Sequence, residues 1–205
     1  QSYVLYSMTQ EQLASTLFPL GSMTKSQVRA IASEKGFASA GKRESQDICF
    51  VPDGDYAGFI ERRIGAKMKN GRFIDTVGND LGEHKGIYRY TVGQRRGIGI
   101  PGAHPMYVCA VRPESNSVVV GTEDKLYSND IVARNINLIP VETIDAPLRV
   151  TAKIRYKQPE QQATVWQPDA DTLRVEFDKP QRAITRGQAV VLYDGDTVIG
   201  GGTIV

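Results

Sequence analysis

From about residue 121 onward, the chain is built of short segments in which apolar and polar side chains alternate. Apolar residues at 148, 150, 152 and 154 are separated by charged or polar ones, and the same spacing recurs from 173 to 177. This period of two is typical of a half-buried strand, and Asp194-Gly195 is a strong hairpin turn. Several short strands in so short a stretch predict a small closed β-barrel, because closure leaves no strand edge exposed.

The beginning of the chain has a helical period instead. Capping-box patterns at 9–12 and 24–27 each precede apolar residues at helical spacing. The apolar runs 3–6 and 48–51 flank them and read as strands. We expect residues 1–48 to be the last β-α-α-β portion of an α/β domain, with the rest of its sheet upstream.

The middle of the chain predicts a small central domain. A helix is expected over 55–64, followed by short strands between glycines, of which 87–90 is one, and by a hairpin from 106–111 to 117–120. The predicted fold class is therefore an α/β remnant followed by a mostly β chain. The predicted domains are residues 1–48, 49–120 and 121–205.

Composition excludes several classes of protein. Hydrophobic residues make up 40% of the 205 and charged residues 23%, which is ordinary for a globular protein. No window approaches the roughly 18 apolar residues of a spanning helix, so no membrane association is expected. Two cysteines cannot build a disulfide framework, which favours a reducing, cytoplasmic location. The chain begins with Gln and has no signal-like segment, so we expect neither a secretory signal nor a natural N-terminus.

Cys49 is the first candidate for chemistry. It ends an apolar run just before the Pro52–Gly54 turn, and α/β sheets present reactive groups where strands enter loops. The alternative is a small buried hydrophobe in a strand, a description that fits Cys109 better. His84 and His104 are the only histidines, and no Cys/His cluster has zinc spacing, so no metal site is predicted. No glycine loop of the phosphate-cradling type is present either.

The segment 82–99 combines four cations with two tyrosines between glycines. Lys85, Arg89, Arg95 and Arg96 can pair with phosphates, while tyrosine rings can stack on unpaired bases. The middle segment carries ten basic against seven acidic side chains, an excess compatible with a polyanionic partner. A surface hairpin with ordinary solvated charges explains the same residues equally well.

A set of short motifs occurs in one order along the chain. They are Gln1-Ser2-Tyr3, Phe18-Pro19-Leu20-Gly21, Ser45-Gln46-Asp47-Ile48-Cys49-Phe50, Gly82-x-His84-x-Gly86, Tyr90-Thr91-Val92-Gly93-Gln94-Arg95, Arg155-Tyr156 and Gly187-Gln188-Ala189. Together they resemble the bacterial tRNA-specific 2-thiouridylase (MnmA) family over essentially the whole chain. The resemblance implies an α/β nucleotide-binding (PP-loop) domain ending near residue 48, a small central domain and a C-terminal barrel like those of translation factors.

The resemblance also implies an activity: sulfur insertion at C2 of the wobble uridine of certain tRNAs. ATP, with magnesium, would adenylate the uracil in the part of the PP-loop domain that lies upstream. Cys49 matches the persulfide-bearing cysteine, which would receive sulfur from a relay protein fed by a cysteine desulfurase. An upstream cysteine would release sulfide or resolve the disulfide.

Site residues follow from the same matches. The resemblance assigns tRNA contacts to Gln1, Arg155, Tyr156 and Gln188. Chemistry alone adds Lys85, Arg89, Arg95 and Arg96 as candidate phosphate contacts. Two hypotheses follow: the C-terminal portion of a tRNA sulfurtransferase that is inactive by itself, and a non-catalytic RNA-binding barrel module in which Cys49 only fills a core.

Overall fold

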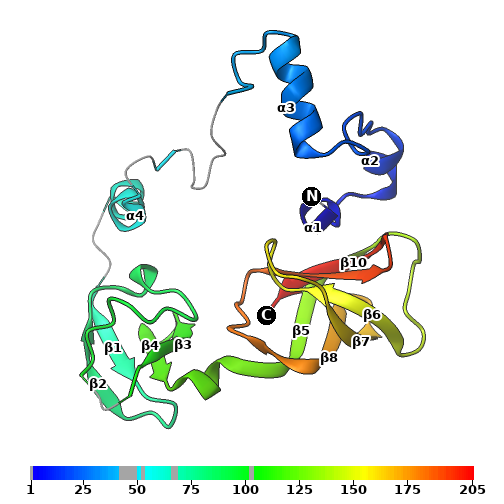
Figure 1. Cartoon of the computed structure of the whole chain (residues 1–205). Helices are drawn as coiled ribbons and strands as arrows, with labels where there is room; N and C mark the ends of the chain where they lie inside the picture. The colour runs from blue at the N-terminus through cyan, green and yellow to red at the C-terminus, as the bar shows by residue number, and fades with distance from the viewer. Residues whose placement is uncertain (1, 42–49, 52–53, 66–68, 102–103) are drawn as a thin grey trace. The chain divides into compact units, whose positions relative to one another are not determined.

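The computed structural model describes residues 2–41, 50–51, 54–65, 69–101 and 104–205 (Figure 1). They form two compact units. One combines the segment up to Gln10 with the chain from Lys69 onward, and the other runs from Glu11 to Gly65. The fold class agrees with the predicted one, whereas the domain limits at 48 and 121 stay predictions.

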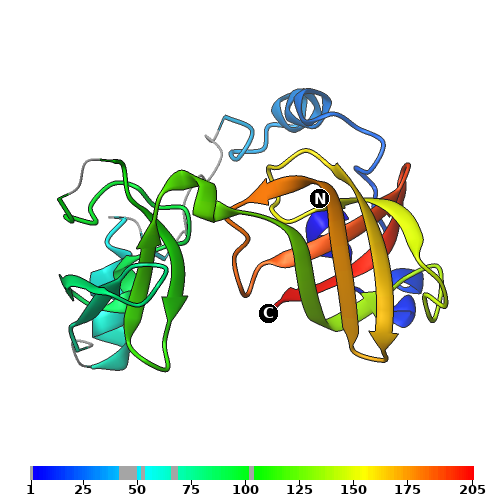
Figure 2. The same ribbon diagram turned by 90° about the horizontal axis from the view of Figure 1, so that it is seen from below.

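The larger unit contains a closed six-stranded barrel, as the alternating pattern predicts. Its strands are β5 (Tyr127–Leu138), β6 (Leu148–Lys153), β7 (Gln161–Asp169), β8 (Thr172–Arg182), β9 (Ala189–Asp194) and β10 (Thr197–Ile204). Around the barrel they follow the order β10-β5-β8-β7-β6-β9, and Figure 2 shows the sheet curling round on itself. The predicted Asp194-Gly195 turn joins β9 to β10.

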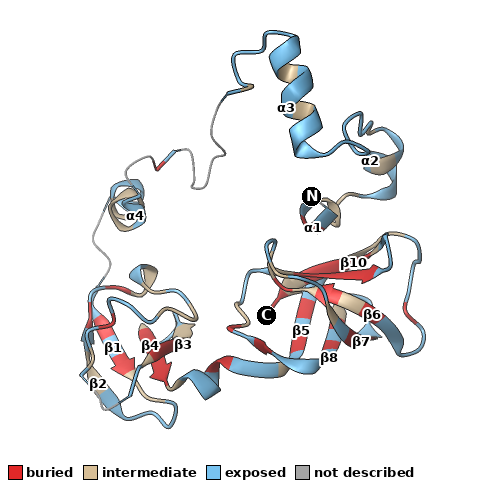
Figure 3. Cartoon of the chain, in the orientation of Figure 1, coloured by how far each residue is buried: buried red, intermediate tan, exposed pale blue. Residues whose placement is uncertain are grey.

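Strict alternation along β8 builds much of the barrel core. Leu173, Val175 and Phe177 point inward and are at most 1% exposed, while Arg174 and Glu176 between them are exposed. The buried stretches therefore alternate with exposed ones along the strand (Figure 3). Burial of these apolar side chains is the main favourable contribution to barrel stability.

Strand β9 departs from this alternation, because both of its faces are covered. Val190 and Leu192 lie in the barrel core, yet Val191 and Tyr193 on the outer face are buried as well. The cover is Tyr3, which packs against that outer pair.

The expectation of a strand over residues 3–6 is wrong. The structure has a helical turn, α1 (Ser2–Leu5), in which the Tyr6 amide donates to the Ser2 carbonyl at 3.1 Å. A short apolar run does not distinguish a strand from a buried helical turn. Here Tyr3 and Tyr6 of the run pack on the outside of the barrel, while Val4 is exposed.

The remaining helices lie in the three regions predicted to be helical. They are α2 (Gln10–Ala14), α3 (Lys25–Glu34) and α4 (Tyr56–Ile64). The capping box of Thr24 and Gln27 is present at the start of α3, and Asp55 caps α4 by accepting from the Gly58 amide. No helix among the described residues is long and apolar enough to cross a membrane. The strand expected over 48–51 falls mostly outside the described residues.

A four-stranded sheet precedes the barrel in the larger unit. Its strands are β1 (Gly71–Ile74), β2 (Asp80–His84), β3 (Tyr107–Arg112) and β4 (Ser117–Gly121), in the order β2-β1-β4-β3. The predicted β3–β4 hairpin is confirmed, and the short helix η2 (Glu123–Leu126) leads from β4 into β5. The strand predicted over 87–90 is wrong, because these residues form the 3-10 helix η1 (Ile87–Arg89).

His84 contacts the residues on either side of η1. Its ring packs edge-on against Phe73 and Tyr90, with ring centroids 5.4 and 5.5 Å away. Nδ1 accepts from the Gly86 amide at 3.1 Å and Nε2 lies 3.2 Å from the Asn116 carbonyl. This arrangement holds the neutral ring with its proton on Nε2, and burial lowers the pKa of His84.

Truncation of Phe177 to alanine should lower the free energy of unfolding by about 3–5 kcal/mol, because it leaves a cavity in a packed core. Chemical denaturation monitored by circular dichroism measures the change. Glu176→Ala, on the exposed face of the same strand, is the matched control and should shift the value by less than about 0.5 kcal/mol. Equal effects of the two changes would contradict the assigned faces of β8.

Acidification should destabilise the protein through His84. Its pKa is lowered in the folded state, so the unfolded state binds more protons below about pH 6.5. Stability is therefore full above that pH and falls as the pH drops toward the folded pKa. Denaturation between pH 7.5 and 5.5 should show a shallower pH slope in His84→Gln than in the parent. An unchanged slope in His84→Gln would contradict this source of the pH dependence.

Candidate functional site

Antiparallel pairing of β6 with β9 brings the predicted barrel residues together. Thr151 lies opposite Tyr193 and Lys153 opposite Val191. Because Lys153 at the end of β6 pairs near the start of β9, the turn after β6 leaves the barrel beside the loop that precedes β9. The turn after β6 and the loop before β9 thus form one edge of the barrel, which we call the rim and define as residues 154–158 and 183–188.

Arg155 ties the two halves of the rim together. Its Nη2 donates to the Ala183 carbonyl at 2.8 Å and to Thr185 Oγ1 at 3.2 Å. Ala183 accepts this contact in a left-handed conformation, with φ of 56°, and its amide donates to the Leu126 carbonyl. A guanidinium has five N–H donors in a planar fork, so Arg155 can hold the loop and still offer donors to a ligand.

Tyr156 and Gln188 are the exposed aromatic ring and the exposed side-chain amide of the rim. The Tyr156 side chain is 52% exposed, and its ring meets that of Tyr3 edge-on at a centroid distance of 6.3 Å. Gln188 is exposed, while its backbone is fixed between Thr185 and Ile204. The Gln188 amide therefore extends from an ordered backbone at the start of β9.

The rim contains two more cations that the sequence pattern did not single out, Lys157 and Arg186. Both are exposed, and among the described residues neither has an ion-pair partner. The sequence could have indicated both, because Lys157 directly follows Arg155-Tyr156 and Arg186 directly precedes Gly187-Gln188. The rim thus offers cations, an aromatic ring and an amide, the groups that contact phosphates and unpaired bases.

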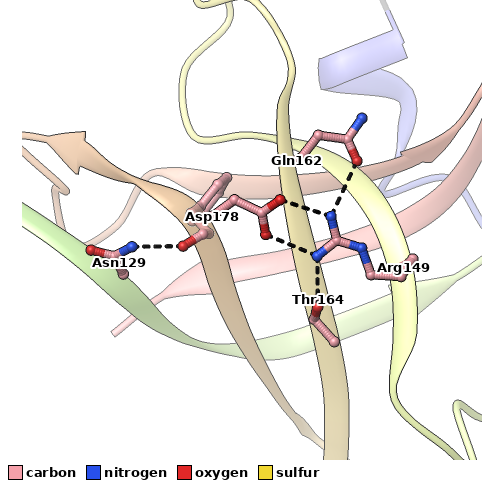
Figure 4. A network of polar contacts seen from close by, with 6 residues as sticks. Asn129, Arg149, Gln162, Thr164 and Asp178 are labelled. Carbon is pink, nitrogen blue, oxygen red and sulfur yellow. Dashed lines mark hydrogen bonds and ion pairs between the residues drawn. The ribbon is translucent and has the colours of Figure 1, made fainter.

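Arg149, elsewhere on β6, is a cation that an ion pair already neutralises. Arg149 contacts both carboxylate oxygens of Asp178, at 2.8 and 2.9 Å, and also reaches Thr164 and Gln162 (Figure 4). This ion pair raises the pKa of Arg149 and lowers that of Asp178. The fork of Arg149 is already occupied by a carboxylate, so this face of the barrel is a poor place for a phosphate.

The candidate phosphate contacts of segment 82–99 lie in the four-stranded part of the larger unit. Lys85, Arg95 and Arg96 are exposed, and within the described chain no ion pair involves them. Arg89 is different, because its guanidinium lies over the Tyr88 ring, 5.2 Å from the centroid, and donates to the hydroxyl.

Gln94 gives the loop before β3 its shape. Its side-chain oxygen accepts from the Thr91 amide at 3.0 Å, and its Nε2 donates to the Arg96 carbonyl at 2.9 Å. Its backbone carbonyl accepts from the Val108 amide at 2.9 Å. The loop that carries Arg95 and Arg96 is therefore ordered by an uncharged side chain, and both cations extend from it into solvent.

Other candidate sites are weaker. Gln1 and Cys49 lie outside the described residues. Cys109 is half-buried, and burial raises the pKa of its thiol, which disfavours the reactive thiolate. In the described part of the chain, no group of three or more His, Cys, Asp or Glu residues could coordinate a metal ion.

An open pocket of about 570 Å³ lies at the end of β5. Its polar lining is largely occupied: Gln10 donates to the Ile139 carbonyl, and Gln167 accepts from the Ile144 amide. The rim, with its exposed cations and ring, is therefore the better candidate for ligand binding.

Models of three known domains match consecutive parts of the chain. They are the tRNA methyl transferase HUP domain over residues 1–53, the tRNA methyl transferase PRC-barrel domain over residues 57–122 and the aminomethyltransferase beta-barrel domain over residues 128–204. The last of these covers the strands of the closed barrel.

Curated relatives match along the entire chain. A Clostridioides difficile protein named tRNA-specific 2-thiouridylase MnmA is 48% identical over 204 residues, which cover 100% of this chain and 56% of the relative. The protein of that name from Acetivibrio thermocellus is 50% identical over 204 residues, covering 100% and 57%. The MnmA 1 protein of Caldanaerobacter subterraneus subsp. tengcongensis is 50% identical over 204 residues, covering 100% and 56%.

The chain spans little more than half the length of these relatives. The three domain models nevertheless follow one another over nearly all of its residues, and the identity to the relatives extends over the same range. The chain belongs to the tRNA-specific 2-thiouridylase (MnmA) family.

Proposed function

We propose that the chain is the C-terminal portion of a tRNA-uridine 2-sulfurtransferase that inserts sulfur at C2 of the wobble uridine. The observation that carries the proposal is the 48–50% identity to named 2-thiouridylases over the full length of the chain. The domain models carry the words methyl transferase, but the relatives are named for thiolation. By itself the chain is proposed to be inactive, because ATP and magnesium would bind to the upstream part of the PP-loop domain that the family resemblance implies.

The chemistry proposed for the whole protein starts with adenylation of the uracil O2 by ATP, which releases pyrophosphate and turns a poor leaving group into AMP. The terminal sulfur of a Cys49 persulfide attacks C2, and AMP leaves with the former O2. A second cysteine thiol then attacks Sγ of Cys49, so the S–S bond of the persulfide breaks and the outer sulfur stays on the base. The two cysteines end as a disulfide, which an external thiol reduces before the next turnover. A persulfide suits this role because it is a strong nucleophile at neutral pH.

The rim is proposed to hold the tRNA. Arg155 pairs with phosphate, Tyr156 stacks on an unpaired base and Gln188 donates or accepts at a base or sugar edge. Gln1 is proposed as a further tRNA contact. Lys85, Arg89, Arg95 and Arg96 would follow the phosphate backbone, with Arg89 also committed to Tyr88. The target base inside an anticodon stem-loop must be turned out of its stack before it is attacked.

Partners and location follow from the same proposal. The Cys49 persulfide would be loaded by a sulfur-relay protein fed by a cysteine desulfurase, in the cytoplasm, with no membrane involved. The proposed organisation is a nucleotide-binding remnant over residues 1–48, a central domain over 49–120 and a barrel over 121–205.

A non-catalytic RNA-binding module is the second candidate. It is favoured by one observation: Arg155, Tyr156 and Gln188 are all presented by loops of the barrel itself. Loading the full-length protein with labelled sulfur from a desulfurase relay separates the two. Label on Cys49 supports the enzyme, and its absence supports the module.

Replacement of Cys49 by serine in the full-length protein should abolish 2-thiouridine formation, because serine cannot carry a persulfide. Mass spectrometry of nucleosides from tRNA incubated with ATP, magnesium and a sulfur donor measures the product. Cys109→Ser is the matched control and should keep nearly the parent rate. A normal rate in the Cys49 variant would refute the assignment.

Neutralisation of Arg95 or Arg96 should make tRNA binding less sensitive to salt. Removing one cation–phosphate pair should reduce the slope of log K against log salt by about 0.7 to 0.9. Titrations at several salt concentrations with Arg95→Gln and Arg96→Gln give the slopes. Arg174→Gln removes the same charge from a cation that lies 3.3 Å from Asp130, so it should leave the slope unchanged. An equal change in all three variants would point to overall charge instead of local phosphate pairing.

A further inference from the structure

Tyr3 is buried against the outer face of β9, next to both loops of the rim. Its side chain is only 9% exposed and packs with Val191 and Tyr193 on the outer face of β9. Its hydroxyl donates to the Ala189 carbonyl at 2.8 Å, and burial raises the pKa of that phenol. The neutral hydroxyl therefore stays a donor, and it is bonded one residue away from Gln188.

The same ring touches the other half of the rim. Tyr3 and Tyr156 meet at a centroid distance of 6.3 Å with 69° between their planes, an edge-to-face arrangement that is favourable for aromatic pairs. Tyr156 itself follows β6 in a turn and is half exposed. A single side chain from α1 thus contacts Tyr156 on one loop and the backbone beside Gln188 on the other.

Several contacts hold α1 in place on the barrel. Asn137 Nδ2 donates to the carbonyls of Tyr6 and Met8 at 2.6 and 3.0 Å. Gly201 in β10 makes room for the Tyr6 ring, since a Cβ there would come within 2.9 Å of it. The docking of the segment is therefore specific, with polar and steric constraints beyond its apolar contacts.

We infer that Tyr3 is a positioning residue for RNA binding, which acts by holding the Tyr156 ring in the orientation that receives a base. The inference rests on the proposed function, because it takes tRNA as the ligand of the rim. Tyr3 itself is buried and needs no contact with RNA. Its contribution is to restrict an exposed side chain before binding, so that less conformational freedom is lost when a base stacks on it.

A double-mutant cycle on the full-length protein tests the inference, with affinity measured for an unmodified tRNA transcript that carries a wobble uridine. Tyr156→Ala should weaken binding roughly 5- to 150-fold, the range for removal of one aromatic stacking interaction. Tyr3→Ala should weaken it about two- to tenfold, the range expected for ordering one side chain. In the Tyr156→Ala background, Tyr3→Ala should have almost no further effect, because the ring on which it acts is gone.

Two further variants separate positioning from folding. Tyr3→Phe keeps the ring contact with Tyr156 and removes only the hydrogen bond to Ala189. Unlike Tyr3→Ala, it should therefore retain most of the parent affinity. Val198→Ala removes packing from the same cluster but pairs with Tyr193, at the end of β9 away from Gln188. It should lower the unfolding temperature while leaving tRNA affinity at the parent value.

The possible failures are distinguishable. Additive effects of Tyr3→Ala and Tyr156→Ala, or a parent-like affinity of Tyr3→Ala beside a weakened Tyr156→Ala, would overturn the positioning role and leave the rim intact. An affinity unchanged by Tyr156→Ala would overturn both the positioning role and the proposed RNA-binding rim. Weakening by Val198→Ala equal to that by Tyr3→Ala would show that the effect arises from stability alone.

Discussion

Closure of the barrel through the β6–β9 pair is the constraint on which the rest of the site depends. Arg155 and Tyr156 belong to one loop and Gln188 to another, and this pairing places the two loops beside each other. The antiparallel register leads one strand out of the barrel where the other enters it. Arg155 then completes the connection by donating to Ala183 and Thr185.

The barrel could be predicted from sequence because its signal is local. Alternation along β8 and the Asp-Gly turn before β10 each specify structure within a few residues. The capping box of Thr24 and Gln27 is local in the same sense. The strand prediction for 87–90 was wrong. This run lies between Gly86, whose amide donates to His84, and Tyr90, whose ring packs against His84, and the local sequence shows neither contact.

The docking of α1 had a sequence signal of another kind. Residues 189–193 are apolar at every position, which in an antiparallel barrel means that something covers the outer face as well as the inner one. That pattern shows that a cover exists without showing which segment provides it. The same limit applies to the rim: residue types at 155, 156 and 188 suit RNA, but only the strand register shows that they share one edge.

The outer face of β9 is covered by residues from the opposite end of the sequence, and this has a practical consequence. A fragment cut to the barrel strands alone would expose Val191 and Tyr193 to water, together with the surface at Gly201 of β10 that accommodates Tyr6. Such a flat apolar surface promotes self-association. A soluble version of the barrel for crystallisation or NMR therefore has to carry Ser2–Gln10 with it, supplied as a fused or separate peptide.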